Sequence, residues 1–372
     1  MAEVAPLIRR PVHLEPDCSY REIGIRSFGK GIFHKPPATS LQIGEKKVFA
    51  IEPGDLLFNI VFAWEGAVAV ASEDERGMIG SHRFLTCVAD PRLADAQYLY
   101  WYFVDGRGLK QLQIASPGGA GRNRTLGVDK LAAIMLDLPT IEEQRRVAKK
   151  LGATVRKITA LRQSAERTRQ EFRATLDSAF HKLIAGAPRV AMGEIAPIVR
   201  RPVEIDPDKT YTEIGVRSFY KGIFHRRTVQ GSQFTWQKLF HIAEEDLVFS
   251  NLMAWEQAIA LATAADEGCV GNHRMLTCEA DRTRCLPVFL WYYFRTPEGL
   301  AQVVAASPGS IARNKTLSAE LLPTIAVPVP SLDAQEWFAA LHAKANAVEL
   351  GRAEVDRALS GLMPSLLHHA FG

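Results

Sequence analysis

The pattern of apolar and polar residues divides the chain into segments of two kinds. In 1–140 and 187–331, short runs rich in valine, isoleucine and aromatic residues alternate with glycine and proline turns. This pattern predicts short strands joined by turns, with some helix. The run 23–33 (IGIRSFGKGIF) has the pattern of a hairpin that turns around its Gly-Lys-Gly sequence. The segment 94–112 contains a stretch that is apolar on every side and predicts a buried helix.

The segments 141–186 and 332–372 have the spacing of long helices. Apolar or small residues recur at spacings of mostly four and three, which predicts one coiled-coil-like seam on each helix. About 40 residues at about 1.5 Å each give a length of about 60 Å, and the single seams suggest that the two helices pair with each other. Gly361 and Pro364 are expected to distort the last turns of the second helix. The seam positions are Leu161, Ala165, Thr168, Phe172, Leu176, Ala179 and Leu183, and then Val348, Val355, Leu359, Leu362 and Leu366.

The sequence contains an internal repeat. The sequence YREIGIRSFGKGIFHK from Tyr20 returns as YTEIGVRSFYKGIFHR from Tyr211, a shift of 191 residues (211 − 20). The same shift maps Gln144 onto Gln335, and no insertion or deletion is needed between Met1 and Gln144. Such a match indicates a duplication of the whole domain and helix unit.

Composition bounds the class of protein. A chain of 372 residues fits two domains, and 47% hydrophobic residues are ample for packed cores. The net charge of only +4 means that any nucleic-acid contact must come from local clusters of basic residues. There is no apolar run of about 18 residues and no apolar signal region, so we expect a cytoplasmic protein without a membrane span. The cysteines form no CxxC pair and are expected to be reduced thiols.

The two junctions between domain and helix carry a family resemblance. The first reads RNRTLGVDKLAAIMLDLPTIEEQRRVAKKL from Arg122, and the second reads RNKTLSAELLPTIAVPVPSLDAQEWFAAL from Arg313. The helices close with LDSAFHKLIAG and LMPSLLHHAFG. In this order, twice over, the motifs resemble the DNA specificity subunit of Type I restriction–modification systems. The chain departs from that family in having Ala334 before Gln335, and in having two unusually similar domains.

The resemblance implies an α+β chain. Two mixed α/β target-recognition domains, 1–140 and 187–331, are followed by spacer helices, 141–186 and 332–372, that run antiparallel in a pseudo-twofold arrangement. Such a subunit is not an enzyme; it reads a bipartite target on double-stranded DNA. It recruits DNA methyltransferase subunits, expected to be two, which bind S-adenosylmethionine, and in the complete machine a motor-nuclease subunit. This chain itself is expected to bind no cofactor. Two similar target-recognition domains in inverted orientation predict that the DNA target is an interrupted near-palindrome.

Basic and polar residues beside glycine turns are the candidate DNA contacts. Arginine can donate two hydrogen bonds to guanine and asparagine can pair with adenine, whereas lysine at a loop tip suits phosphate. A metal role for the histidines would need more ligands nearby. The candidates in the first copy are Arg26, Ser27, Lys30, His34, Lys35, His82, Arg83, Arg122, Asn123 and Arg124. Those in the second are Arg217, Ser218, Lys221, His225, Arg226, His273, Arg274, Arg313, Asn314 and Lys315.

Each candidate has a structural alternative. The hairpin residues could instead form a solvated turn with Phe28 and Phe33 in the core. The histidines could make structural hydrogen bonds, and the asparagines could cap the helices that follow them. Trp64 and its counterpart Trp255 are expected in the core. Arg9–Arg10 and the matching pair in the second copy suit either phosphates or an ordinary surface.

Differences between the copies mark where base reading would diverge. The pairs, first copy to second, are Gly29 to Tyr220, Pro36 to Arg227, Asn59 to Ser250, Ile60 to Asn251, Gly66 to Gln257 and Ser81 to Asn272.

A second apolar stripe on the first helix predicts a surface for methyltransferase helices. It comprises Val147, Leu151, Val155 and Ile158. The alternative function is a stand-alone DNA-binding or scaffold protein of a defence system without a methyltransferase. A metal-dependent nuclease built on Asp55 is a third hypothesis, which the second copy disfavours because it lacks the neighbouring Glu45 and Lys46. No methyltransferase loop or phosphate-binding GxxxxGK[ST] motif is present.

Overall fold

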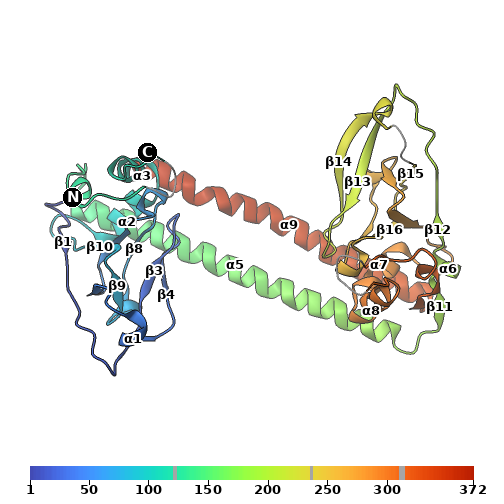
Figure 1. Cartoon of the computed structure of the whole chain (residues 1–372), viewed down its shortest axis with the longest axis horizontal. Helices are drawn as coiled ribbons and strands as arrows, with labels where there is room; N and C mark the ends of the chain where they lie inside the picture. The colour runs from blue at the N-terminus through green and yellow to red at the C-terminus, as the bar shows by residue number, and fades with distance from the viewer. Residues whose placement is uncertain (120–123, 235–237, 310–314) are drawn as a thin grey trace. The chain divides into compact units, whose positions relative to one another are not determined.

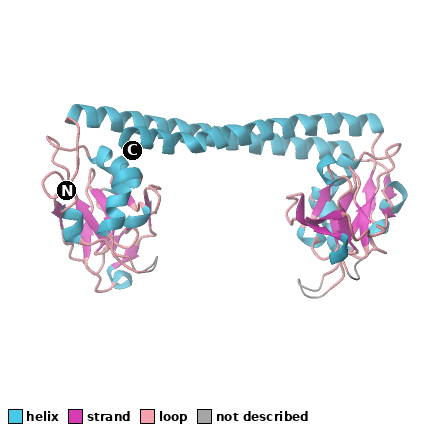
Figure 2. Cartoon of the chain, turned by 90° about the horizontal axis from the view of Figure 1, so that it is seen from above, coloured by secondary structure: helices cyan, strands magenta, loops and turns pink. Residues whose placement is uncertain are grey.

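A computed structural model describes residues 1–119, 124–234, 238–309 and 315–372 (Figure 1). The chain forms two compact units. Unit 1 combines Met1–Ala165 with Arg352–Gly372, and unit 2 is Glu166–Gly351. Each unit contains β-strands, short helices and one segment from each of two long helices (Figure 2). Within the described residues, no helix is both long and apolar enough to span a membrane.

Unit 1 is built on an antiparallel sheet in the order β1-β10-β7-β8. Its register aligns Leu56 with Cys87, and its strands are β1 (Leu7–Ile8), β7 (Leu56–Asn59), β8 (Val68–Val70) and β10 (Phe84–Cys87). Three two-stranded ladders accompany it: β2 (Ser19–Tyr20) with β5 (Ala38–Thr39), β3 (Ile23–Ile25) with β4 (Ile32–His34), and β6 (Val48–Ala50) with β9 (Ile79–Ser81). Its short helices are α1 (Ser40–Ile43), α2 (Ala96–Val104), α3 (Gly106–Ala115) and α4 (Val128–Ala132), with 3-10 helices at Ala63–Glu65 and Glu73–Glu75.

The predicted single helix at 94–112 is two helices. Asp105 has an extended backbone between α2 and α3, and its carboxylate accepts a hydrogen bond from the N–H of Gly106 at 2.7 Å. Aspartate at this position satisfies a free N–H at the start of α3, so it ends one helix and begins another. The apolar α2 is buried as predicted: its Phe103 packs edge to face on Phe58 of β7, with ring centroids 5.3 Å apart.

Unit 2 repeats the main sheet in the order β12-β19-β16-β17, and Leu247 aligns with Cys278 as Leu56 does with Cys87. These strands are β12 (Ile198–Val199), β16 (Leu247–Ser250), β17 (Ile259–Leu261) and β19 (Met275–Cys278). A second sheet has the order β14-β13-β18-β15, formed by β13 (Thr210–Val216), β14 (Ile223–Gln230), β15 (Leu239–His241) and β18 (Val270–Asn272). The other elements are β11 (Arg189–Ala191), β20 (Ala326–Pro328), α6 (Met192–Ile195), α7 (Pro287–Arg295), α8 (Pro297–Ala305), and 3-10 helices at Gly231–Gln233, Ala254–Glu256, Ala264–Asp266 and Leu322–Thr324.

The two long helices are α5 (Ile141–Ile184) and α9 (Leu332–Phe371), as the spacing predicted. Helix α9 continues through Gly361 and Pro364 and does not end at either residue. In unit 1, Arg162 of α5 donates to Ser360 of α9 at 3.4 Å. In unit 2, the rings of Phe180 and Phe338 lie 4.9 Å apart. The α5 and α9 segments are therefore in contact within each unit.

The predicted seam and partner stripe of α5 require correction. Leu161 and Phe172, placed in the seam, are 56% and 42% exposed. Leu151 and Ile158, placed on the partner stripe, are buried at 3% and 6% exposure, and Val147 and Val155 are half-buried against the same core of unit 1. Leu151 and Ile158 therefore offer no free surface, and Val147 and Val155 are only partly exposed. An α-helix drifts by about 20° per heptad from a 3.5-residue repeat, so a seam extrapolated over several heptads leaves the buried face.

Candidate nucleic-acid interface

Two backbone hydrogen bonds hold the turn between β3 and β4 against the end of the 3-10 helix Ala63–Glu65. The N–H of Phe28 donates to the carbonyl of Glu65 at 2.8 Å, and the N–H of Gly29 donates to that of Gly66 at 3.0 Å. Phe28 has a φ of 62°, a left-handed conformation that is unusual for a bulky residue. Its side chain is 68% exposed, so it does not lie in the core. The ammonium of Lys30 lies 5.7 Å from its ring centroid, which makes an exposed aromatic and cationic tip.

The second copy builds the same tip. Phe219 has a φ of 61° and is 58% exposed, and Lys221 lies 5.8 Å from its ring centroid. Strain of this kind persists only where surrounding contacts hold it, and it often marks functional surface. Its presence in both units identifies the tip as a built feature of the repeat.

At the base of each tip, the candidate serine is hydrogen-bonded to a carboxylate, whereas the candidate arginine lies over an aromatic ring. Ser27 donates to the carboxylate of Glu65 at 2.8 Å, and Ser218 donates to Glu256 at the same distance. These serines therefore anchor the turn. Arg26 is exposed and lies 4.9 Å from the ring centroid of Phe33. Arg217 likewise lies 4.8 Å from the ring centroid of Phe224.

The next candidates are tied to carboxylates. His34 lies 2.5 Å from the buried Glu75 and His225 lies 3.1 Å from Asp266. Burial by itself raises the pKa of Glu75, but hydrogen bonds from His34 and Ser72 outweigh it and hold that pKa below its ordinary value. This arrangement favours the structural alternative for the two histidines.

The basic residue after each histidine also has an acidic partner. Lys35 lies 3.3 Å from Glu22. In unit 2 the buried Glu213 has two arginine partners, Arg226 at 3.7 Å and Arg227 at 3.0 Å. The change from Pro36 to Arg227 thus adds a second cation beside this carboxylate.

The turn from β9 to β10 presents two side chains without a protein partner. The backbone N–H of Arg83 donates to Ser81 at 3.4 Å, which fixes the turn. The side chains of His82 and Arg83 are exposed, and in the described part of the chain they make no hydrogen bond or ion pair. In unit 2, Asn272 accepts from the N–H of Arg274 at 2.9 Å, and His273 and Arg274 are exposed in the same way.

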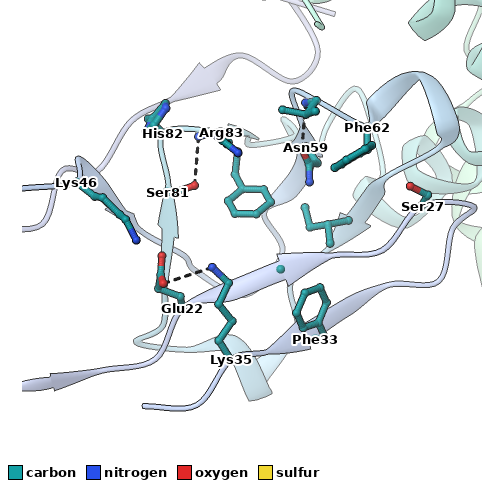
Figure 3. A pocket seen from close by; sticks show the side chains of 14 residues that line it. Glu22, Ser27, Phe33, Lys35, Lys46, Asn59, Phe62, Ser81, His82 and Arg83 are labelled. Atoms are coloured by element: carbon teal, nitrogen blue, oxygen red, sulfur yellow. Dashed lines mark hydrogen bonds and ion pairs between the residues drawn. The ribbon is translucent and has the colours of Figure 1, made fainter. Parts of the chain in front are cut away.

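An open cavity of about 650 Å³ in unit 1 lies between this turn and the β3–β4 ladder (Figure 3). It collects Ser27, Lys35, His82 and Arg83 from the predicted set. Arg26, Lys30 and His34 are not among its lining residues. Sequence reasoning missed Lys46 and Phe62 as candidate contacts, because single polar or aromatic residues in a strand-rich segment carry no local signal. It named Asn59 only as a position that differs between the copies. The lining is completed by Glu22, Gly24, Ile25, Phe33, Val61, Ser81 and Phe84.

The glycine-rich loop is described at its two ends, 116–119 and 124–125 in the first copy and 307–309 and 315–316 in the second. Arg122, Asn123, Arg313 and Asn314 lie outside the described residues. The guanidinium of Arg124 lies 5.2 Å from the ring centroid of Trp64, and the ammonium of Lys315 lies 5.7 Å from that of Trp255.

Both tryptophans are half-buried rather than in the core, contrary to the prediction. Each indole N–H donates to a backbone carbonyl three residues earlier, Trp64 to Val61 at 3.0 Å and Trp255 to Leu252 at 2.9 Å. The exposed part of each ring can hold the neighbouring cation, because the ring face attracts positive charge electrostatically.

The N-terminal arginine pairs are occupied. Arg10 donates two hydrogen bonds to the buried Asp55, at 2.7 and 3.0 Å, and Arg201 repeats this on Asp246 at 2.7 and 3.1 Å. Arg9 donates to the carbonyl of Phe84 at 2.9 Å. Asp55, the centre of the nuclease hypothesis, is therefore paired with an arginine. Among the described residues, no three His, Cys, Asp or Glu side chains are grouped so that they could hold a metal ion.

No protein-family model matches the chain, and no curated protein matches its sequence. Solved structures match it over its whole length. The HsdS subunit from Thermoanaerobacter tengcongensis is 17% identical, with 100% of this chain and 95% of that chain covered and a TM-score of 0.57. A chain in a structure described as the "structural basis underlying complex assembly and conformational transition of the type I R-M system" is 17% identical, with 99% and 97% covered and a TM-score of 0.63. The Type I restriction-modification S subunit from M. genitalium is 13% identical, with 98% and 93% covered and a TM-score of 0.50.

At these identities the likeness concerns the fold. The chain has the α+β fold of Type I restriction–modification specificity subunits, with two β-rich domains joined by two long helices in contact. The resemblance stated from the junction motifs is confirmed at this level.

Proposed function

We propose that this chain is the DNA-recognition subunit of a restriction–modification or related methyltransferase complex, and that it reads a bipartite, near-palindromic target. The observation that carries the proposal is the paired turn, His82–Arg83 and His273–Arg274. In each unit an exposed arginine, whose side chain has no hydrogen bond or ion pair to any described residue, stands on a backbone fixed by a side-chain hydrogen bond. A fixed backbone lowers the cost of ordering the arginine, and a free guanidinium can donate two hydrogen bonds to guanine.

Other candidates take different roles in this proposal. Lys30 and Lys221, at the exposed tips, suit phosphates, whereas Arg26 and Arg217 remain candidates for base or phosphate contact. Ser27 and His34, with their counterparts Ser218 and His225, position the turn. Lys35 and Arg226 belong to the proposed DNA-binding surface, where each lies beside a carboxylate. Arg124 and Lys315 belong to it as well, and each lies over the ring of a tryptophan. Arg122, Asn123, Arg313 and Asn314 stay as proposed contacts of the glycine-rich loop.

The near-palindrome follows from the likeness of the two units. The main sheets have the same strand order, and the candidate turns correspond residue for residue at a shift of 191. Two such readers in the inverted orientation that the family resemblance implies would select similar half-sites as an inverted repeat.

The proposed partners are DNA methyltransferase subunits that bind S-adenosylmethionine, with a motor-nuclease subunit in the complete machine, acting in the cytoplasm. One structure that shares this fold is described as a type I R-M complex assembly. Because the stripe from Val147 to Ile158 is occupied, we place the methyltransferase contact on unit 2. There Trp337 of α9 is 56% exposed beside an open groove of about 620 Å³ on α5. The groove is lined also by Ala174, Thr175, Ser178, Ala179, Lys182 and Leu183.

The decisive test is selection from a randomised DNA pool, with the chain alone and with a candidate methyltransferase. We expect two similar inverted half-sites at a fixed gap. Arg83→Ala should relax the choice of base in one half-site and Arg274→Ala in the other, at a cost of about 1–3 kcal/mol each. Arg76→Ala, which removes an exposed arginine paired with Glu73, is the matched control and should leave the selected sequence unchanged. Recovery of no sequence under either condition would refute DNA recognition.

The partner contact has its own test. At the position of Trp337, the first copy has Arg146, so Trp337→Arg installs a residue that the repeat already tolerates. We expect this variant to lose co-purification with the methyltransferase and to keep its DNA binding. Unchanged co-purification would rule out this surface.

A further inference from the structure

Unit 2 holds an arginine that is surrounded by aromatic rings. Arg295, the last residue of α7, is half-buried, with its guanidinium 4.5 Å from the ring centroid of Trp291, 5.5 Å from that of Tyr220 and 5.6 Å from that of Tyr292. Within the described chain it makes no ion pair. Rings attract a cation through their faces but do not neutralise it, so the hydrogen-bonding edge of this guanidinium is left for another group.

The arginine lines a small cavity between α5, α7 and α9, with a volume of about 160 Å³. Two further guanidinium groups, Arg169 and Arg173, belong to its α5 wall, and the buried His342 and the exposed Asn346 belong to its α9 wall. The remaining lining residues are Phe172, Leu176, Tyr292, Ala345, Val348 and Glu349.

The charge of this cavity is unbalanced. Glu349 is the one carboxylate in its lining, and it lies 3.7 Å from Arg169. The nearby Asp177 accepts a hydrogen bond from the hydroxyl of Tyr292 at 2.7 Å. In the described residues, neither Arg173 nor Arg295 has an ion-pair partner. The three guanidinium groups of the lining thus outnumber its one carboxylate, and a buried imidazole lies in the same wall.

The duplication supplies an internal comparison. At a shift of 191 residues, Arg295 corresponds to Val104, His342 to Leu151 and Asn346 to Val155, so the first copy is apolar where the second is polar. In unit 1 these three side chains belong to the hydrophobic core or pack against it. Tyr220, which supplies one of the rings around Arg295, replaces Gly29.

The polar residues at these three positions of the second copy are expected to lower folding stability. Placing an arginine and a histidine where valine and leucine suffice costs free energy unless another group compensates. The side-chain amide of Asn346 lies 3.4 Å from Nδ1 of His342 and aromatic rings surround Arg295, but among the described residues no ion pair neutralises this arginine. A bound anion would supply that compensation.

We propose that this cavity binds a single phosphate-type oxyanion, held by Arg295 and Arg173 with His342 and Asn346 in hydrogen-bonding reach. Guanidinium groups match the geometry of such oxygens and bind them more strongly than neutral donors do. The cavity is smaller than the about 300–1,000 Å³ of sites for drug-sized ligands, so it suits one small anion rather than a nucleotide. The site is independent of DNA reading, because it uses α5, α7 and α9 and none of the candidate DNA contacts.

The test is calorimetric titration of the full chain with inorganic phosphate, compared with acetate and chloride at matched ionic strength. We expect binding of phosphate alone, with a rise in Tm. Arg173→Ala removes an exposed arginine without disturbing the core, and should weaken phosphate binding by at least about tenfold, as expected for loss of a charged hydrogen bond. Arg167→Ala, an exposed arginine on the same helix outside the cavity lining, is the matched control and should bind normally.

A second variant installs the residues of the first copy. Arg295→Val, His342→Leu and Asn346→Val together should abolish phosphate binding and remove the phosphate-dependent rise in Tm. Equal heats with acetate or chloride, or undiminished binding by the Arg173→Ala variant, would overturn the proposal. Because DNA selection is measured separately, failure here leaves the DNA-recognition proposal standing.

Discussion

The fully buried side-chain amide of Gln144 accepts a hydrogen bond from the backbone N–H of Asp95 at 3.1 Å. It also donates to the carbonyls of Leu93 at 3.1 Å and Pro139 at 2.9 Å. Gln335 makes the same three bonds in unit 2, at 2.8, 3.1 and 2.9 Å. One amide therefore joins the start of each long helix to the segment before the apolar helix of the domain.

This arrangement explains the departure at the second junction. Glu143 in the first turn of α5 bonds only to Arg146, an exposed pair, and its counterpart is Ala334. The glutamine carries the structural role of the motif, and the residue before it is free to vary.

Gln144→Leu should destabilise unit 1 by about 2–3 kcal/mol, because it leaves buried backbone groups without a partner. Glu143→Ala, which copies the second junction, should stay within about 0.5 kcal/mol of the wild type. Urea unfolding followed by circular dichroism measures both. Equal losses for the two variants would contradict this assignment.

Arg10→Ala should also destabilise unit 1, by about 3 kcal/mol, because it leaves the buried Asp55 carboxylate without its cation. Asp55 would keep only the hydrogen bond from the N–H of Glu52. Arg76→Ala removes a solvent-exposed ion pair and serves as the control, with an expected loss of less than about 1 kcal/mol. A stable Arg10→Ala protein with weakened DNA binding would instead assign Arg10 to phosphate.

The exposed tips give a prediction about salt. Lys30→Ala and Lys221→Ala should each weaken binding to all DNA sequences alike and reduce the slope of log affinity against log salt by about 1, since each removes one phosphate contact. Affinity is measured at several salt concentrations by fluorescence anisotropy. If either change altered the preferred bases and left the slope intact, the lysine would be a base contact.

Protonation of His342 should destabilise unit 2. Burial and the charge of Arg295 hold the pKa of His342 below its ordinary value. The unfolded chain then takes up the proton more readily, so this contribution to stability is present above a pH of about 6.5 and is lost as the pH falls below it. The charged neighbours are Arg169 and Arg173 of α5, and Glu349 of α9.

The measurement compares the Tm of the wild type and His342→Leu at pH 7.5 and 5.5, in chloride without phosphate. The wild type should lose more Tm on acidification than the variant. Parallel losses would show that other groups govern the acid response.

Sequence periodicity and the repeat predict the fold of this chain well, because strands, turns and long helices leave local patterns. They do not predict which partner a side chain finds. His34 looks like a free loop histidine until Glu75, 41 residues later, is placed beside it. Leu151 looks like a docking residue because periodicity defines an apolar stripe without saying what covers it. Phe28 looks like a core residue because its positive φ has no sequence signal outside glycine.

The difference between Gly29 and Tyr220 shows how a sequence difference misleads about specificity. The hydroxyl of Tyr220 donates to the carbonyl of Phe294 at 2.6 Å, so this side chain is fastened within unit 2 rather than extended toward DNA. In unit 1, a Cβ at Gly29 would lie 3.1 Å from the side chain of Val104, and the hydroxyl of Tyr100 donates to the carbonyl of Gly29 at 2.8 Å.

Gly29→Tyr should therefore destabilise unit 1 by about 1–3 kcal/mol through overpacking and leave the selected DNA sequence unchanged. Unfolding in urea and selection from a randomised pool measure the two effects separately. Ser81→Asn, which copies the second unit at the edge of the candidate reading cavity, is the informative comparison. It should keep stability within about 0.5 kcal/mol, because asparagine makes the same turn-fixing bond in unit 2. A shifted half-site in the Gly29→Tyr variant, with stability intact, would return this position to the reading surface.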